Sequence, residues 1–284
     1  MRRFVLIFLL TGMLVPTAAR AEDGYDLWLR YAPIENISLR DAYRQTIAGL
    51  IVQQSPATAA MVSQELARGL VALLGVPVPS RATVDRDGVL IVGTIAAPVI
   101  ATLGWRDELT RLGPEGFVIR YARINGHRAL VVASAGDSGA LYGTFHLLRL
   151  LSTATPIDRL DIRERPRHQL RLLNHWDNLN GSIERGYAGQ SLWRWDELPS
   201  RVDPRLRDYA RASASLGLNG AVLNNVNADP RVLTAEYLAK VAAIADTLRP
   251  YGSKVYLSAN FAAPRLIGGL ATADPLDPDV QRWW

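Results

Sequence analysis

The chain has 284 residues, about half of them apolar and about a fifth charged, which is the composition of a folded globular protein and excludes a disordered one. It contains no cysteine, which excludes disulfides, thiol catalysis and zinc–thiolate sites. The formal net charge of +5 comes almost entirely from arginines scattered along the sequence, and we assign no partner to it.

The first 21 residues have the three parts of a secretory signal peptide. Arg2 and Arg3 give a positive start, residues 4–15 are almost all apolar, and Ala19-Arg20-Ala21 is a small-x-small cleavage site. The apolar run is shorter than the roughly 20 residues that cross a bilayer, so a retained anchor is the less favoured alternative. We therefore predict a signal peptide over 1–21 and an exported protein, periplasmic or extracellular, without membrane association after cleavage. Cleavage would also bring the 32 basic residues close in number to the 27 acidic ones, which predicts no nucleic-acid partner.

Residues 22–151 mix helices with short strands and predict a small N-terminal α+β domain. Ser55 and Pro56 are typical of a helix start and Gly75 of its end, while Asn125-Gly126 is a strong hairpin signal. In chain order, we predict a helix over 56–74, a strand over 89–92, hairpin strands over 117–121 and 129–133, and a helix over 140–148. The glycine-rich turn before the last helix lacks the spacing of nucleotide-binding loops, so we predict no nucleotide binding there and interpret the turn as a packing feature.

A charged stretch with two prolines, 152–166, suits a linker, and the pattern changes after it. Strands and amphipathic helices then alternate: a strand over 170–175, a helix from Asp203-Pro204 to Gly217, a strand over 220–225, a helix from Thr234 to Pro250, and a strand over 254–260. Such a βαβαβ order requires a parallel sheet with right-handed crossovers. On this evidence alone, a doubly wound sheet and an eight-stranded barrel both remain open.

Polar residues follow each of these three strands. The first strand ends in Asn174-His175-Trp176-Asp177-Asn178, the second in Asn224-Asn225-Val226-Asn227, and the third in Ser258-Ala259-Asn260. The carboxyl ends of parallel strands meet on one face, where ligands bind in both architectures. Amides and imidazole hydrogen-bond to hydroxyls and an indole stacks on a pyranose ring, so this set suits a sugar. Taken singly, each Asn is more typical of a turn and His175 of a structural histidine.

A long insertion, residues 179–199, separates the first of these strands from its helix. Loops of this length inside a compact domain are usually functional. Glu184 and Asp196 lie in it, but nothing in their spacing fixes their separation, so we do not interpret them as a catalytic pair.

Two segments carry a resemblance to a known family. Residues 171–193 (RLLNHWDNLNGSIERGYAGQSLW) resemble the opening barrel segment of the family 67 α-glucuronidases, and residues 218–228 (LNGAVLNNVNA) resemble their second strand. The similarity extends from 24–31 (GYDLWLRY) to 277–284 (DPDVQRWW). It implies an α+β domain over 22–151, a linker over 152–166, and over 167–284 the first part, about three βα units, of a (β/α)8 TIM barrel.

The resemblance also implies an activity. Such enzymes release glucuronic acid or its 4-O-methyl ether from xylan oligosaccharides with inversion, without metal or cofactor, and we consider a homodimer for the full-length enzyme. Their catalytic carboxylates follow the Trp-Trp pair matched by Trp283 and Trp284. The chain is therefore expected to be an inactive N-terminal fragment whose catalytic residues lie beyond residue 284.

The family's pattern assigns substrate-binding roles to five residues. Trp176 is implied as a sugar-facing aromatic and Val226 as an apolar contact near the 4-O-methyl position, with His175, Asn174 and Asn225 as hydroxyl partners. Asn180 departs from the aspartate expected there and should tune the loop. The alternative is a secreted, non-catalytic carbohydrate-binding or scaffold protein.

Overall fold

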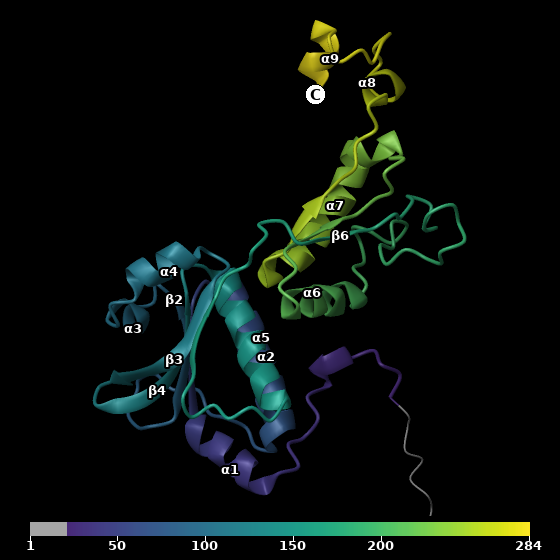
Figure 1. Cartoon of the computed structure of the whole chain (residues 1–284). Coiled ribbons are helices and arrows are strands. Elements are labelled where there is room, and N and C mark those ends of the chain that lie inside the picture. Colours follow the sequence, from purple (N-terminus) through teal and green to yellow (C-terminus); the bar gives the residue numbers. More distant parts are fainter. Residues whose placement is uncertain (1–21) are drawn as a thin grey trace, which may run out of the picture. The chain divides into compact units, whose positions relative to one another are not determined.

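The computed structural model describes residues 22–284, so the predicted signal peptide lies outside the described residues (Figure 1). The chain divides into two compact units, residues 1–30 and 31–284. The described part of the first unit contains a short 3-10 helix, η1 (Leu27–Arg30). The second unit contains all the strands of the described residues, arranged in two sheets.

The first sheet has five strands in the order β1-β2-β4-β3-β5. Their bounds are β1 (Gly49–Gln53), β2 (Val89–Thr94), β3 (Phe117–Ile124), β4 (His127–Ser134) and β5 (Asp161–Glu164). Strands β1, β2 and β4 run parallel, and β3 pairs antiparallel with both β4 and β5. This mixed sheet is the core of the predicted α+β domain.

Helices cover both faces of this sheet, which explains why β2 is buried along its whole length. On one face, α2 (Pro56–Leu74) and α5 (Asp137–Ser152) lie side by side (Figure 1). On the other face, Ile100 of α3 (Pro98–Ala101) and Leu109 of α4 (Arg106–Leu112) join the core that contains Ile91. Helix α1 (Ile37–Thr46) packs against α2.

The local signals used for this domain are confirmed. Helix α2 starts at Pro56 and ends at Gly75, whose φ of 74° is the left-handed conformation that favours glycine. Asn125 and Gly126, with φ of 51° and 84°, form the two-residue turn between β3 and β4.

The second sheet is parallel, in the order β6-β7-β8: β6 (Leu172–Asn174), β7 (Gly220–Val222) and β8 (Lys254–Tyr256). It alternates with α6 (Arg205–Ser215) and α7 (Ala235–Leu248), so the predicted βαβαβ order and the mixed α/β fold class are confirmed. The strands are shorter than predicted: regular pairing ends at Asn174, Val222 and Tyr256. Short helices fill the connections and the C-terminal stretch: η2 (Pro230–Leu233), η3 (Arg249–Tyr251), α8 (Ala263–Leu266) and α9 (Pro278–Trp283).

The segment between the two sheets holds more structure than a plain linker. Within residues 152–166, β5 pairs with β3 and so extends the first sheet. The domain boundaries themselves stay a prediction.

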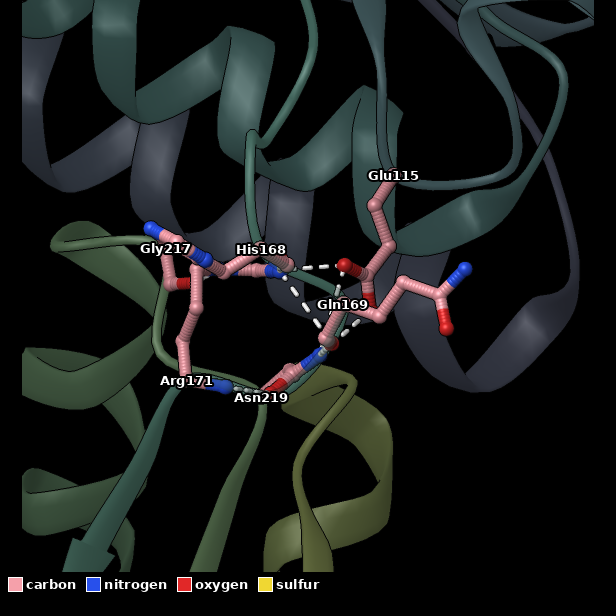
Figure 2. A network of polar contacts seen from close by, with 6 residues as sticks. All are labelled: Glu115, His168, Gln169, Arg171, Gly217 and Asn219. Carbon is pink, nitrogen blue, oxygen red and sulfur yellow. Dashed lines mark hydrogen bonds and ion pairs between the residues drawn. The ribbon is translucent and has the colours of Figure 1, made fainter.

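A polar cluster connects the turn before β3 to the starts of β6 and β7 (Figure 2). The Arg171 guanidinium donates to Glu115 Oε2 at 2.6 Å and to the carbonyls of Gly217 and His168 at 2.6 and 2.7 Å. Asn219 Nδ2 donates to Glu115 Oε1 at 3.0 Å and to the Gln169 carbonyl at 2.6 Å. The Glu115 carboxylate therefore accepts hydrogen bonds from one guanidinium and one amide at the amino ends of the second sheet.

Among residues 22–284, no helix is both long and apolar enough to span a membrane.

Candidate functional site

The carboxyl ends of β6, β7 and β8 lie next to one another. The sheet register sets Asn174 beside Val222 and Val222 beside Tyr256. Beyond the strands, the His175 N–H donates to the Val222 carbonyl and the Leu223 N–H to the Tyr256 carbonyl, both at 3.0 Å. The polar segments that follow the three strands therefore start side by side at one edge of the sheet, as the sequence predicts.

Two asparagine side chains that follow β7 and β8 form hydrogen bonds with backbone groups of the chain. Asn224 Nδ2 donates to the Ser258 carbonyl at 2.9 Å, and its Oδ1 accepts from the Ser258 N–H at 2.8 Å. Asn260 Nδ2 donates to the Ala228 carbonyl at 2.9 Å. These amides fix the shape of the loops.

Asn225, one of the five predicted substrate contacts, is buried and ties the loop after β7 to the loop after β6. Its Nδ2 lies 3.4 Å from the carbonyls of both Trp176 and Glu184, and its Oδ1 accepts from the Asn227 N–H at 2.9 Å. Its own N–H donates to the Asp177 carbonyl at 2.9 Å. In this geometry Asn225 positions the backbone of Trp176, and its role as a hydroxyl partner stays a prediction.

His175 packs into an aromatic cluster. Its ring makes edge-on contacts with Trp193 and Tyr209, at centroid distances of 5.0 and 5.4 Å, and its Nε2 lies 2.8 Å from the Tyr209 hydroxyl. Burial raises the pKa of Tyr209 to about 12, so its hydroxyl keeps its proton and can donate to Nε2. Burial lowers the pKa of His175, although the Asp177 carboxylate acts in the opposite direction. The imidazole is therefore neutral near pH 7, and its Nδ1 lies 4.0 Å from the Asp177 carboxylate.

Asp177 anchors the long loop. Its carboxylate is only 2% exposed and accepts a hydrogen bond from the Ser191 hydroxyl at 2.6 Å. The Ser191 oxygen in turn accepts from the Trp193 N–H at 3.0 Å. Sequence reasoning missed Ser191 and Tyr209, because neither belongs to a strand end; the length of the loop and its tryptophans were the available signals.

The exposed members of the predicted set are Trp176, Val226 and Asn174. Trp176 is 39% exposed and Val226 50% exposed, whereas Trp193 and Trp195 of the long loop are buried. Asn174 is also exposed. Three of the five predicted residues thus offer surface to a ligand, while His175 and Asn225 lie behind them.

The loop carboxylates do not converge on a site. Asp196 is exposed, and Glu184 is half-buried with its carbonyl accepting from Asn178 Nδ2 at 2.8 Å. Asn180 Oδ1 accepts from the Ser182 N–H and hydroxyl, at 3.0 and 2.7 Å, so this side chain shapes the loop. In the described part of the chain, no three His, Asp or Glu side chains gather as metal ligands.

Comparison with known proteins decides the family. The family model described as the glycosyl hydrolase family 67 N-terminus matches residues 27–147, and the one described as the family 67 middle domain matches residues 150–284. The chain belongs to glycosyl hydrolase family 67.

Curated relatives of this family 67 chain include α-glucuronidase A of Emericella nidulans, 37% identical over 295 residues covering 100% of the chain and 33% of the relative. The probable α-glucuronidase A of Aspergillus oryzae is 35% identical, over 93% of the chain and 31% of the relative. The chain thus spans about a third of the length of these relatives.

A solved structure supports the fold. A family GH115 4-O-methyl-α-glucuronidase with specificity for decorated arabinogalactans aligns with a TM-score of 0.53 at 18% identity, over 82% of this chain and 32% of that one. At this identity, the similarity concerns the fold alone.

Proposed function

We propose that the chain forms the N-terminal part of an exported α-glucuronidase that removes glucuronic acid or its 4-O-methyl ether from xylan oligosaccharides. The observation that carries the proposal is the similarity of the whole chain to proteins named α-glucuronidase A. The exposed Trp176 and Val226 at the carboxyl ends of a parallel sheet support it, because ligands bind at this edge of α/β folds.

In this proposal the described residues provide one wall of the substrate pocket. The Trp176 indole offers a flat apolar face to a pyranose ring, and Val226 offers an apolar surface to the 4-O-methyl group. Asn174 supplies hydrogen bonds to hydroxyls, while His175, Asn225 and Asp177 position the Trp176 backbone from behind. The second sheet is proposed to be the start of a TIM barrel.

The bond-breaking groups are proposed to lie outside residues 1–284. An inverting glycosidase needs a general acid and a general base on carboxylates roughly 6.5–9.5 Å apart, with room for a water molecule between the base and the sugar. Asp177, the buried carboxylate at this edge, is occupied by Ser191 and lies behind the exposed indole. We therefore assign it to loop positioning and give it no part in proton transfer.

The test compares two polypeptides on oligosaccharides bearing 4-O-methylglucuronic acid: the 284-residue chain and one that continues along the same reading frame. The longer protein should release the uronic acid, and NMR should show the β-anomer forming first from the α-linked substrate. The 284-residue chain should release none. Activity of the short chain, or first appearance of the α-anomer, would overturn the proposal; binding without hydrolysis by both would favour a carbohydrate-binding protein.

A further inference from the structure

Folding gathers cationic side chains that are far apart in the sequence. Arg111 lies in the last turn of α4, Arg165 and Arg167 follow β5, and Lys254 starts β8. All four line one hollow of about 530 Å³, here named the basic hollow, and all four side chains are solvent-exposed. The arginines scattered along the sequence are thus in part clustered in space, at the amino ends of the second sheet and so at the opposite edge from Trp176.

The charge of the basic hollow is not neutralised by the chain. Among residues 22–284, none of these four side chains forms an ion pair or a hydrogen bond with another residue. One carboxylate, Glu115, lines the hollow, but Figure 2 shows it directed at Arg171 and Asn219, to which it is hydrogen-bonded. Four positive charges therefore face solvent around a concave surface without a matching anion, which favours an acidic ligand.

The other residues that line the basic hollow favour one kind of acidic ligand over others. Tyr256 and the 62%-exposed Leu170 offer flat or apolar surface, and the Gln169 amide points away from the polar cluster toward solvent (Figure 2). Aromatic and apolar faces pack on the C–H faces of sugar rings, amides pair with hydroxyls, and a guanidinium binds a carboxylate with two parallel hydrogen bonds. A volume of about 530 Å³ lies within the roughly 300–1,000 Å³ of small-molecule pockets, enough for a short carbohydrate segment.

We propose that the basic hollow binds a uronate-bearing segment of a polysaccharide, at a second site separate from the one at Trp176. Arg165 and Arg167 hold the carboxylates, and Tyr256 contacts a sugar ring. The site would keep the protein on an acidic polysaccharide. It depends neither on Trp176 nor on catalysis, so the failure of one proposal leaves the other intact.

The experiment measures binding of glucuronoxylan to the 284-residue chain by affinity electrophoresis and calorimetry, with unsubstituted xylo-oligosaccharides and poly-L-glutamate as comparison probes. The R165Q/R167Q variant should bind glucuronoxylan roughly ten-fold more weakly at low salt, since two exposed charge contacts are lost. Binding by the unaltered chain should weaken as salt rises above about 0.1 M, because the Debye length then falls below about 10 Å and the attraction between exposed charges is screened.

One double variant serves as the control. R159Q/R201Q removes the same charge from exposed arginines outside the hollow and should bind like the unaltered chain. An equal loss in R159Q/R201Q would overturn the proposal in favour of general charge attraction. Full binding by R165Q/R167Q, or equal affinity for poly-L-glutamate, would also overturn it.

Discussion

At the scale of single residues, a buried ion pair between α2 and α6 holds the second unit together. The Arg211 guanidinium donates to both Glu65 carboxylate oxygens, at 2.7 and 2.8 Å, and the Tyr31 hydroxyl donates to the same carboxylate at 2.6 Å. Both charged side chains are less than a tenth exposed. Removing one partner would leave the other charge buried without compensation.

We therefore predict that Arg211→Met lowers the free energy of unfolding by about 3–5 kcal/mol. The double variant E65M/R211M should be less destabilised than the single one, since no buried charge is left unpaired. Chemical denaturation followed by circular dichroism measures both. Arg201→Met breaks an exposed pair with Glu197 and should cost less than about 1 kcal/mol; an equal cost in Arg201→Met would contradict this account.

The pKa of His175 links stability to pH. Because burial lowers its pKa in the folded state, the unfolded chain binds the proton more readily. The stabilisation by the neutral imidazole is complete above the unfolded value of about 6.5 and is lost as pH falls through the lowered folded value.

The melting temperature should accordingly fall between pH 7.5 and pH 5, and His175→Gln should make this fall smaller. His168→Gln, at an exposed histidine, should leave the slope as in the unaltered chain. Differential scanning calorimetry at several pH values provides the comparison. Identical slopes for His175→Gln and the unaltered chain would exclude this role for His175.

At the scale of elements, Glu115 connects the N-terminal domain to the starts of β6 and β7. Glu115→Gln would weaken the bonds to Arg171 and Asn219, at a cost of about 1–3 kcal/mol for charged hydrogen bonds. Amide hydrogen exchange should become faster in β6 and β7 and stay unchanged in β2, which is buried along its whole length. Glu236→Gln, at an exposed carboxylate that pairs with Lys240, is the control. Uniform acceleration in β2 and β6 would argue against a local connection.

The sequence predicted elements well where local chemistry dominates. Pro56 and Gly75 bound α2, and Asn125-Gly126 turns the chain between β3 and β4, because each imposes a backbone conformation by itself. The sequence predicts a linker where β5 forms, since the pairing of β5 with β3 depends on a distant partner. Likewise, the sequence placed Asn225 and His175 at the correct edge, but their inward hydrogen bonds depend on Glu184 and Tyr209 from other segments.

At the scale of the molecule, the two edges of the second sheet differ in chemistry. The carboxyl edge presents Trp176 and Val226 over a hydrogen-bonded layer that includes His175, Asn225 and Asp177, and the amino edge presents the basic hollow. The spacing of arginines along the sequence does not reveal this charge distribution, because only folding brings Arg165 and Arg167 to the same hollow as Lys254. We infer that the carboxyl edge recognises the terminal uronic acid and that the amino edge attracts the acidic chain.

The central claim is that Trp176 forms a wall of the sugar pocket, and its substitution tests this most directly. In the proposed longer enzyme, Trp176→Ala should lower kcat/KM for a 4-O-methylglucuronic acid-bearing oligosaccharide about 30- to 150-fold, as expected for about 2–3 kcal/mol of lost apolar contact. Leu238→Ala, at an exposed apolar residue of α7, should leave it unchanged. Equal kcat/KM values for Trp176→Ala and the unaltered enzyme would contradict the assignment of this edge as the substrate site.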